Sequence, residues 1–256
     1  MILIPLLLLI GLAVWPACYL VGHDRGEREP VKALWAAFGL GALGAACAVV
    51  LESAIPSKYI STEHPVSLGM SLLLACLAAG LIEEICKFAP AAWYLYRKRY
   101  FNEHTDGIIY FAIAGLGFGV PENILYVLEF GVGVGFVRVM LTPFFHAAMT
   151  GLVGYYLVGL KLDHKPKPQV VYALIVAAIT HGLYDFGLLS RKPWLIMTSL
   201  LITFGCTVML FLLYRQATRA GRAVGLSVVG NNSFCRACGF ANPKHHLHWQ
   251  SCGEIA

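Results

Sequence analysis

Residues 67–96 read SLGMSLLLACLAAGLIEEICKFAPAAWYLY, and this stretch decides the fold class. It is an apolar run long enough to cross a bilayer, which takes about 20 residues of helix. Glu83, Glu84 and Lys87 lie near its middle. An ionised group at that depth costs roughly 3 kcal/mol or more, so a lipid-facing helix would not carry three of them. The stretch therefore predicts a transmembrane helix whose charged side chains face protein or a water-filled cavity.

The rest of the chain has the composition of a polytopic membrane protein. Of its 256 residues, 58% are hydrophobic and 13% are charged, and the mean hydropathy is +0.69, which is typical of that class. The first apolar segment has no cleavage site of a signal peptide, so we interpret it as an uncleaved span. We expect an all-α membrane bundle over 1–220, a linker at 221–233 and a small tail at 234–256. About seven transmembrane helices are expected, near 1–22, 31–51, 67–96, 107–128, 136–160, 170–190 and 194–214.

The basic residues are distributed unevenly between the two sides of this bundle. One side has only Lys58, Arg191 and Lys192, together with Arg138 at the edge of a span, whereas the other side has about three times as many basic residues. Because basic loops stay in the cytoplasm, we expect the N-terminus outside and the C-terminus in the cytoplasm of a bacterial or archaeal plasma membrane. The net charge of +5 reflects these loops, and no nucleic-acid partner is expected. The basic residues on the expected cytoplasmic side are Arg25, Arg28, Lys32, Arg97, Lys98, Arg99, Lys161, Lys165, Lys167, Arg215, Arg219 and Arg222.

Ionisable groups on four different spans are expected at one depth. They lie about 11 to 15 residues inside the expected cytoplasmic ends of their spans, roughly 17–23 Å at 1.5 Å per residue. Polar groups within a bilayer must converge or be solvated. We therefore predict one buried polar site, slightly toward the outer leaflet. Its members are Glu83, Glu122, His146, His181 and Asp185.

Local spacing suggests how some of these groups interact. Glu83 and Lys87 are four residues apart, so they can pair on one helix face. His181 and Asp185 have the same spacing in HGLYD. Asp185 can therefore orient the imidazole and fix its tautomer, or act as a ligand itself. Glu122 follows three glycines and a proline in GLGFGVPE, which predicts a kinked, narrow helix that other backbones can approach closely.

Two kinds of hydrolytic chemistry suit this set of residues. Glu122, His146 and His181 form a ligand set for a divalent metal, with zinc as the natural choice. The metal would make a bound water more acidic, and a nearby glutamate could take its proton. Without a metal, a glutamate could activate water directly while the histidines stabilise the oxyanion.

The alternative function is an ion- or proton-coupled transporter or channel, because polar residues within spans also mark ion pathways. Such a pathway needs polar groups at several depths. This chain concentrates them at one level, which favours a hydrolytic site.

Three motifs resemble those of the PrsW family of intramembrane proteases, relatives of the CAAX-processing and Abi membrane proteases. EExxK matches EEICK at 83–87, FxxxE matches FGVPE at 118–122, and HxxxD matches HGLYD at 181–185. The motifs occur in order on three separate spans. The resemblance implies hydrolysis of a peptide bond in or near the membrane. The implied substrate is a single-pass membrane protein such as an anti-sigma factor, cut from the extracytoplasmic side.

The resemblance also assigns roles to these residues. One of Glu83 and Glu84 would be the general base, and Lys87 would keep the acidic pair ionised. Asp185 would orient His181. The ligands of a metal or of the oxyanion would be Glu122, His146 and His181.

The C-terminal tail resembles a short zinc ribbon. The sequence FCRACG at 234–239 is a zinc knuckle, and a second half ends in Cys-Gly at 252–253. The expected third cysteine is replaced by Trp249, so His248 or His246 would supply the missing ligand. We expect a zinc-binding module that docks a cytoplasmic partner; the alternative is a decayed ribbon that is unfolded without metal. The expected tail ligands are Cys235, Cys238, Cys252 and His248.

Overall fold

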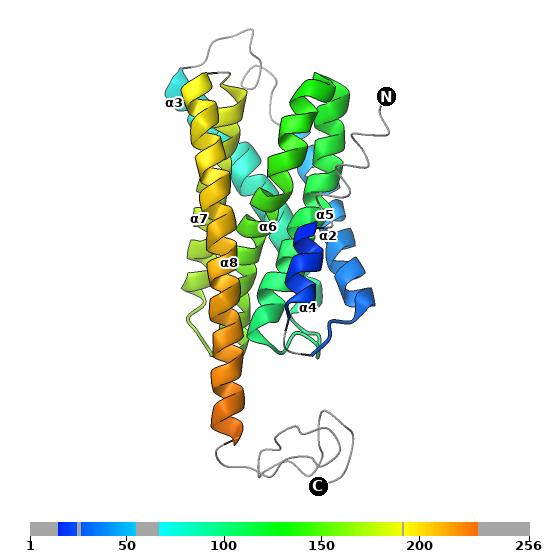
Figure 1. Cartoon of the computed structure of the whole chain (residues 1–256). Coiled ribbons are helices and arrows are strands. Elements are labelled where there is room, and N and C mark those ends of the chain that lie inside the picture. Colours follow the sequence, from blue (N-terminus) through cyan, green and yellow to red (C-terminus); the bar gives the residue numbers. More distant parts are fainter. Residues whose placement is uncertain (1–14, 25–26, 55–66, 191, 230–256) are drawn as a thin grey trace.

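The computed structural model describes residues 15–24, 27–54, 67–190 and 192–229. All regular elements in this described part are helices, which confirms the predicted all-α fold (Figure 1). Five of these helices are long and apolar enough to span a membrane. The expected first span lies largely outside the described residues, as does the whole zinc-ribbon-like tail.

The helices follow the predicted order, and their bounds lie close to the expected ones. A helical segment at 15–22 precedes the first long helix. The long helices are α2 (Val31–Ser53), α5 (His104–Phe130), α6 (Val132–Leu162), α7 (Pro168–Leu189) and α8 (Pro193–Val229).

The stretch at 67–96 is built from three consecutive elements. It contains α3 (Leu68–Ala75), the π-helix η2 (Cys76–Ile82) and α4 (Glu83–Leu95). A π-helix has i→i+5 hydrogen bonds and occurs mostly as short insertions at functional sites. Here it occupies the two turns directly before the glutamate pair. The sequence pattern predicted one continuous span and did not predict this local widening.

Helices α5 and α6 form the buried centre of the bundle, and α2 and α8 lie more at its surface. Glycines allow close helix contacts around α5. A Cβ atom added at Gly117 would lie 2.0 Å from the backbone oxygen of Phe38 in α2. One added at Gly119 would lie 2.8 Å from the His146 ring in α6. The predicted narrow helix is therefore present, although α5 continues as a helix through Pro121.

The last helix is longer than the sequence pattern indicated. We expected the seventh span to end near residue 214, yet α8 continues to Val229 and includes part of the predicted linker at 221–233. In Figure 1 its C-terminal part projects beyond the other helices. The division into bundle, linker and tail stays a prediction.

Candidate metal centre

The glutamate pair begins α4, directly after the π-helix. Glu83, Glu84 and Lys87 are all buried. The Lys87 ammonium donates to Glu83 Oε2 at 3.2 Å and to Glu84 Oε1 at 2.9 Å. One cation therefore compensates two carboxylates, as buried charges require.

Close packing of η2 on α7 fixes the position of this turn. A Cβ atom at Gly80 would lie 2.1 Å from the backbone oxygen of Ala178, and one at Gly182 would lie 2.4 Å from Cys76 Cα. Only glycine permits two backbones to approach so closely. The glutamates are thus held against the helix that carries His181.

Phe118 explains the aromatic position of its motif. The Lys87 Nζ atom lies 4.2 Å from the centroid of the Phe118 ring. The centroids of the Phe118 and His146 rings are 5.6 Å apart. A cation over an aromatic face is stabilised by the ring quadrupole, by about 2 kcal/mol where both are desolvated. The phenylalanine therefore forms one wall of the polar site and helps to retain its lysine.

His181 contacts both glutamates. Its Nδ1 lies 2.9 Å from Glu84 Oε1 and 3.2 Å from Lys87 Nζ. Its Nε2 lies 3.6 Å from Glu83 Oε2 and 3.3 Å from Asp185 Oδ2, without a hydrogen bond. The hydrogen bond that fixes the ring is thus made by Glu84. Asp185, predicted as the orienting residue, makes a looser contact on the other side of the imidazole.

His146 is paired with Glu122 on the neighbouring helix. The two side chains meet at 2.7 Å between His146 Nε2 and Glu122 Oε2. The other oxygen of Glu122 accepts a hydrogen bond from Arg138. Both oxygens of Glu122 therefore have protein partners here, and its role as a metal ligand stays a prediction.

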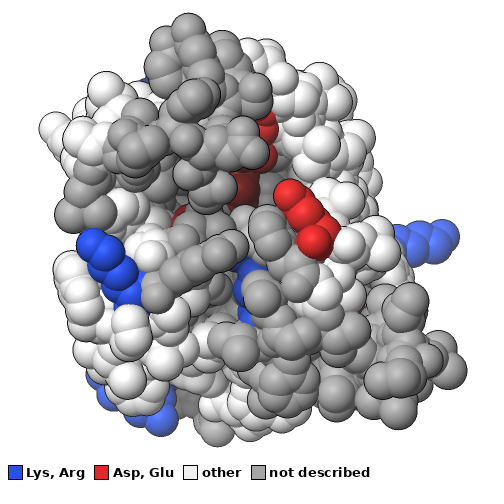
Figure 2. Space-filling view, turned by 90° about the horizontal axis from the view of Figure 1, so that it is seen from above, with Lys and Arg blue, Asp and Glu red and all other residues white. Residues whose placement is uncertain are grey.

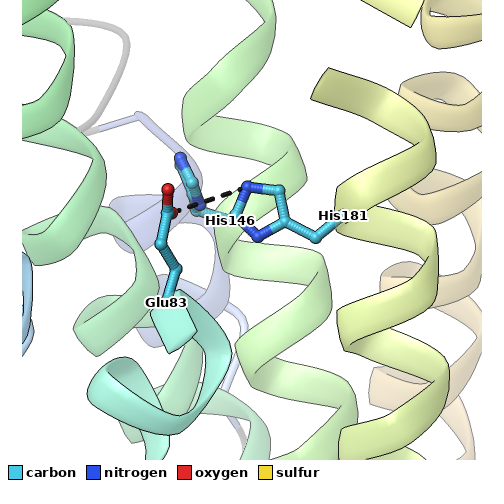
Figure 3. A group of neighbouring side chains, drawn as sticks. All are labelled: Glu83, His146 and His181. Atoms are coloured by element: carbon cyan, nitrogen blue, oxygen red, sulfur yellow. Dashed lines mark ion pairs between the residues drawn. The ribbon is translucent and has the colours of Figure 1, made fainter. Parts of the chain in front are cut away.

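One carboxylate and two imidazoles converge in the centre of the bundle. One ligand atom each from Glu83, His146 and His181 lie within 4.8 Å of one another, and all three residues are buried (Figure 3). In the described part of the chain, His146 Nδ1 and His181 Nε2 are buried without a hydrogen-bond partner. Imidazole nitrogen and carboxylate oxygen are the donors that Zn²⁺ accepts in catalytic sites. These residues fit a divalent cation, with Glu83 in the place predicted for Glu122.

The balance of charges at this level also suits a cation. Six buried charged residues lie at this level, and we call them the cation-paired cluster: Glu83, Glu84, Glu122, Asp185, Lys87 and Arg138. Its carboxylates outnumber its permanent cations by two, which a divalent ion would offset. Viewed from one end of the bundle, acidic and basic atoms are visible recessed within the surface (Figure 2).

Two residues of this region, Arg138 within the cluster and Glu52 beside it, were not predicted as members of the site. Arg138 was counted as an outer-side charge at a span edge, but it is buried within α6. A lone arginine in an apolar run is itself a signal of a buried partner. Glu52 lies just beyond the expected end of the second span at residue 51, yet it belongs to α2, and its Oε1 is buried without a hydrogen bond. Its carboxylate interacts electrostatically with Glu122 and Asp185.

The fold and the site define a polytopic membrane protein with a buried carboxylate–imidazole centre suited to hydrolysis. Residues 29–214 match the PrsW family of intramembrane metalloproteases. The chain belongs to this family, as the three ordered motifs predicted.

The chain is similar to several proteins named Protease PrsW. That of Bacillus subtilis (strain 168) is 32% identical over 187 residues, covering 72% of this chain and 82% of the relative. That of Geobacillus kaustophilus is 29% identical over 191 residues, or 73% of this chain and 82% of the relative. The Oceanobacillus iheyensis protein is 29% identical over 211 residues, or 82% and 95%. No solved structure matches the chain. The comparisons give no support to the transporter or channel alternative.

Proposed function

We propose that this intramembrane protease hydrolyses a peptide bond in or next to the membrane of a single-pass protein substrate, with anti-sigma factors as the substrate class. The observation that carries the proposal is the convergence of Glu83, His146 and His181 inside the bundle. Three groups of this kind have no shared structural task in an apolar core, because each costs free energy to bury. The names of the relatives support a proteolytic activity.

Glu83 is proposed as the general base. Of the glutamate pair, Glu83 has 7% of its side chain exposed and Glu84 has 1%. Water therefore reaches Glu83 more readily. Glu83 takes a proton from the attacking water and passes it to the leaving amine, a role that contributes about 10²- to 10⁴-fold.

The remaining polar residues position the site. Glu84 holds His181 through its Nδ1, and Lys87 keeps both glutamates charged by its two hydrogen bonds. Asp185 lies against the opposite nitrogen of His181. These contacts hold the two imidazoles and Glu83 around one point.

His146 and His181 would hold a divalent cation, proposed as zinc, beside Glu83, whose carboxylate stays free to take a proton from water. When bound, a zinc ion supplies Lewis-acid polarisation of the scissile carbonyl and makes water a better nucleophile at neutral pH. Glu122, predicted as a ligand from the sequence, would instead support the ligand His146 from behind, as carboxylates commonly do in histidine metal sites.

The site is proposed to open toward the extracytoplasmic side. Arg215 and Arg219 are exposed on the C-terminal part of α8, and by the positive-inside rule they support a cytoplasmic location of that end. The N-terminus would then be outside. The tail, with Cys235, Cys238 and Cys252, would be a cytoplasmic zinc module that docks a partner.

Cleavage by purified variants tests the proposal. The full-length protein is reconstituted with a single-pass substrate, and Glu83→Gln is compared with Glu129→Gln, which changes an exposed glutamate near the end of α5. We expect Glu83→Gln to lose about 10²-fold or more in kcat and Glu129→Gln to retain normal cleavage. Normal cleavage by folded Glu83→Gln would remove the assigned role of Glu83.

A further inference from the structure

Arg138 is the second permanent cation of the cation-paired cluster, and it is not one of the residues proposed to activate water or to bind metal. It lies in α6 and has only 3% of its surface exposed. Its guanidinium is stacked 3.6 Å from the centroid of the Tyr126 ring of α5. A desolvated, stacked arginine is held in one orientation, because the planar group has a preferred face and edge.

The edge of this guanidinium meets two carboxylates from different helices. One Nη atom donates to Glu122 Oε1 on α5, and the other lies 3.6 Å from Asp185 Oδ1 on α7. Arg138 thus links three helices at one point. A lysine could not replace it in this contact, because an ammonium is a single point charge without the planar fork.

Each of these carboxylates uses its second oxygen on a histidine. Glu122 Oε2 lies 2.7 Å from His146 Nε2, and Asp185 Oδ2 lies 3.3 Å from His181 Nε2. Two branches therefore lead from one arginine to the two imidazoles of the candidate metal centre. The branch through Glu122 has hydrogen-bond geometry at both steps; the branch through Asp185 consists of ion-pair contacts.

The Glu122 branch determines which nitrogen of His146 carries the proton. A guanidinium only donates hydrogen bonds, so the carboxylate facing it acts as an acceptor. The partner nitrogen, His146 Nε2, must then be the N–H donor. His146 Nδ1, which is buried and makes no hydrogen bond in the described structure, is left with its lone pair. This is the tautomer that a cation at the centre requires.

We propose that Arg138 is a positioning residue that anchors Glu122, so that His146 presents the lone pair of its Nδ1 to the cation. The inference rests on the proposed metal-dependent function for its consequence, but its structural part is measurable on metal-free protein. Arg138 itself touches neither the cation nor the substrate.

The test compares Arg138→Lys with Arg215→Lys in the full-length protein. Both changes keep the charge, and Arg215 lies at an exposed position of α8 away from the site. The NMR chemical shifts of the ring nitrogens in ¹⁵N-labelled histidines report the tautomer. The His146 signals are those that are absent from the spectrum of His146→Ala. Zn²⁺ affinity is then read from the same His146 signals, so that zinc bound by the tail does not enter the measurement.

We expect the metal-free wild type and Arg215→Lys to show His146 with its proton on Nε2, and Arg138→Lys to show a mixture of tautomers. Zn²⁺ affinity at His146 should fall roughly 10- to 100-fold in Arg138→Lys, as for other residues that support a ligand. Thermal unfolding in detergent establishes that Arg138→Lys is folded. An unchanged tautomer, or an unchanged affinity, in folded Arg138→Lys overturns the proposal.

The same experiment separates this inference from the proposed function. If the wild type binds no Zn²⁺ at His146 while Arg138→Lys still changes the tautomer, the anchoring role stands and the metal-dependent function fails. If Arg138→Lys does not fold, Arg138→Gln replaces it and leaves Glu122 intact, since its amide keeps a donor but neither the charge nor the planar fork. Loss of the single Nε2-protonated tautomer in that variant supports the proposal, and its retention overturns the proposal.

Discussion

The bundle buries two groups of carboxylates, one within it and one at an end, and stabilises them by different means. The cation-paired cluster, within the bundle, compensates its carboxylates with Lys87 and Arg138. At one end of the bundle, a second group surrounds the start of α5, and we call it the capping cluster. In the described residues, its buried Asp106 has no ion pair and instead accepts hydrogen bonds from backbone N–H groups. The capping cluster consists of Glu29, Glu103, Asp106 and Tyr110.

Each contact of the capping cluster performs a structural task. Asp106 Oδ2 accepts from the N–H groups of Asn102 at 2.6 Å and Glu103 at 2.7 Å. The Glu103 side chain in turn forms the other half of a capping box at the start of α5. Tyr110 donates its hydroxyl proton to Glu29. These bonds satisfy the free N–H groups of a helix start.

A structural acidic group is distinguished from a reactive one by which groups bind its oxygens. In the capping cluster, backbone N–H groups and the Tyr110 hydroxyl bind the carboxylate oxygens, and none of its four members is an imidazole. In the cation-paired cluster and the two histidines beside it, Glu84 Oε2, His146 Nδ1 and His181 Nε2 are buried without a hydrogen bond. Unsatisfied polar atoms of this kind cost roughly 1–3 kcal/mol each and persist where function requires them.

The largest contrast is expected on removal of metal. Dialysis against a chelator should abolish cleavage, and Zn²⁺ should restore it, because two imidazoles and Glu83 offer the only close ligand group among the described residues. His146→Ala should lose the membrane-site zinc while retaining any zinc of the tail, measured as metal content. Asp106→Asn is the matched change in the capping cluster and should keep both zinc and activity. Full activity after complete removal of metal would contradict the metal-dependent branch.

The next contrast concerns stability. Lys87→Met leaves Glu83 and Glu84 without their shared cation, and breaking a buried ion pair in this way costs about 3–5 kcal/mol. Thermal unfolding in detergent should show a large fall in Tm. A second substitution of both glutamates by glutamine should restore much of it.

The control for this contrast is Lys161→Met, near the capping cluster. Lys161 donates to the backbone oxygens of Lys98 and Phe101. Losing such a hydrogen bond costs only about 1–3 kcal/mol. Equal losses in the two variants would show that Lys87 is no more important to its carboxylates than Lys161 is to its carbonyls.

The smallest effect is expected in the capping cluster itself. Burial raises the pKa of Glu29, against the lowering effect of its hydrogen bonds to Asp106 and Tyr110. A raised carboxyl pKa means that its stabilising contribution is present at low pH and is lost as the pH rises through the folded-state pKa. Glu29→Gln should therefore have the Tm of the wild type near pH 4.5 and a slightly higher one at pH 8. The exposed Glu27→Gln serves as control; a Tm at pH 8 below that of the wild type would contradict the sign.

The fold class and much of the candidate site follow from the sequence alone. Charges in the middle of a span can only face inward, so Glu83, Lys87 and His181 were placed in one group from depth and spacing. The structure brings them together. Helix bounds were predictable for the same reason, because apolar length reflects the thickness of the bilayer.

The pairing within the site could not be predicted in the same way. Depth arguments give the level of a side chain but not its direction around the helix axis. For this reason Glu122 was expected among the ligands, whereas it lies between His146 and Arg138. Arg138 itself was misjudged because a boundary error of a few residues turns a buried arginine into a loop residue.

The π-helix at Cys76–Ile82 sets the direction in which the glutamate pair points around the axis of its span, and the site depends on this direction. Each residue turns an α-helix by about 100°. Gain or loss of one residue here would therefore rotate the glutamate pair away from the imidazoles, although every residue of the site would still be present. The site therefore depends on the length of this segment as well as on Gly80, which packs against α7. Deletion of one alanine from this segment removes no residue of the site, yet we expect it to inactivate the enzyme as fully as the loss of a glutamate.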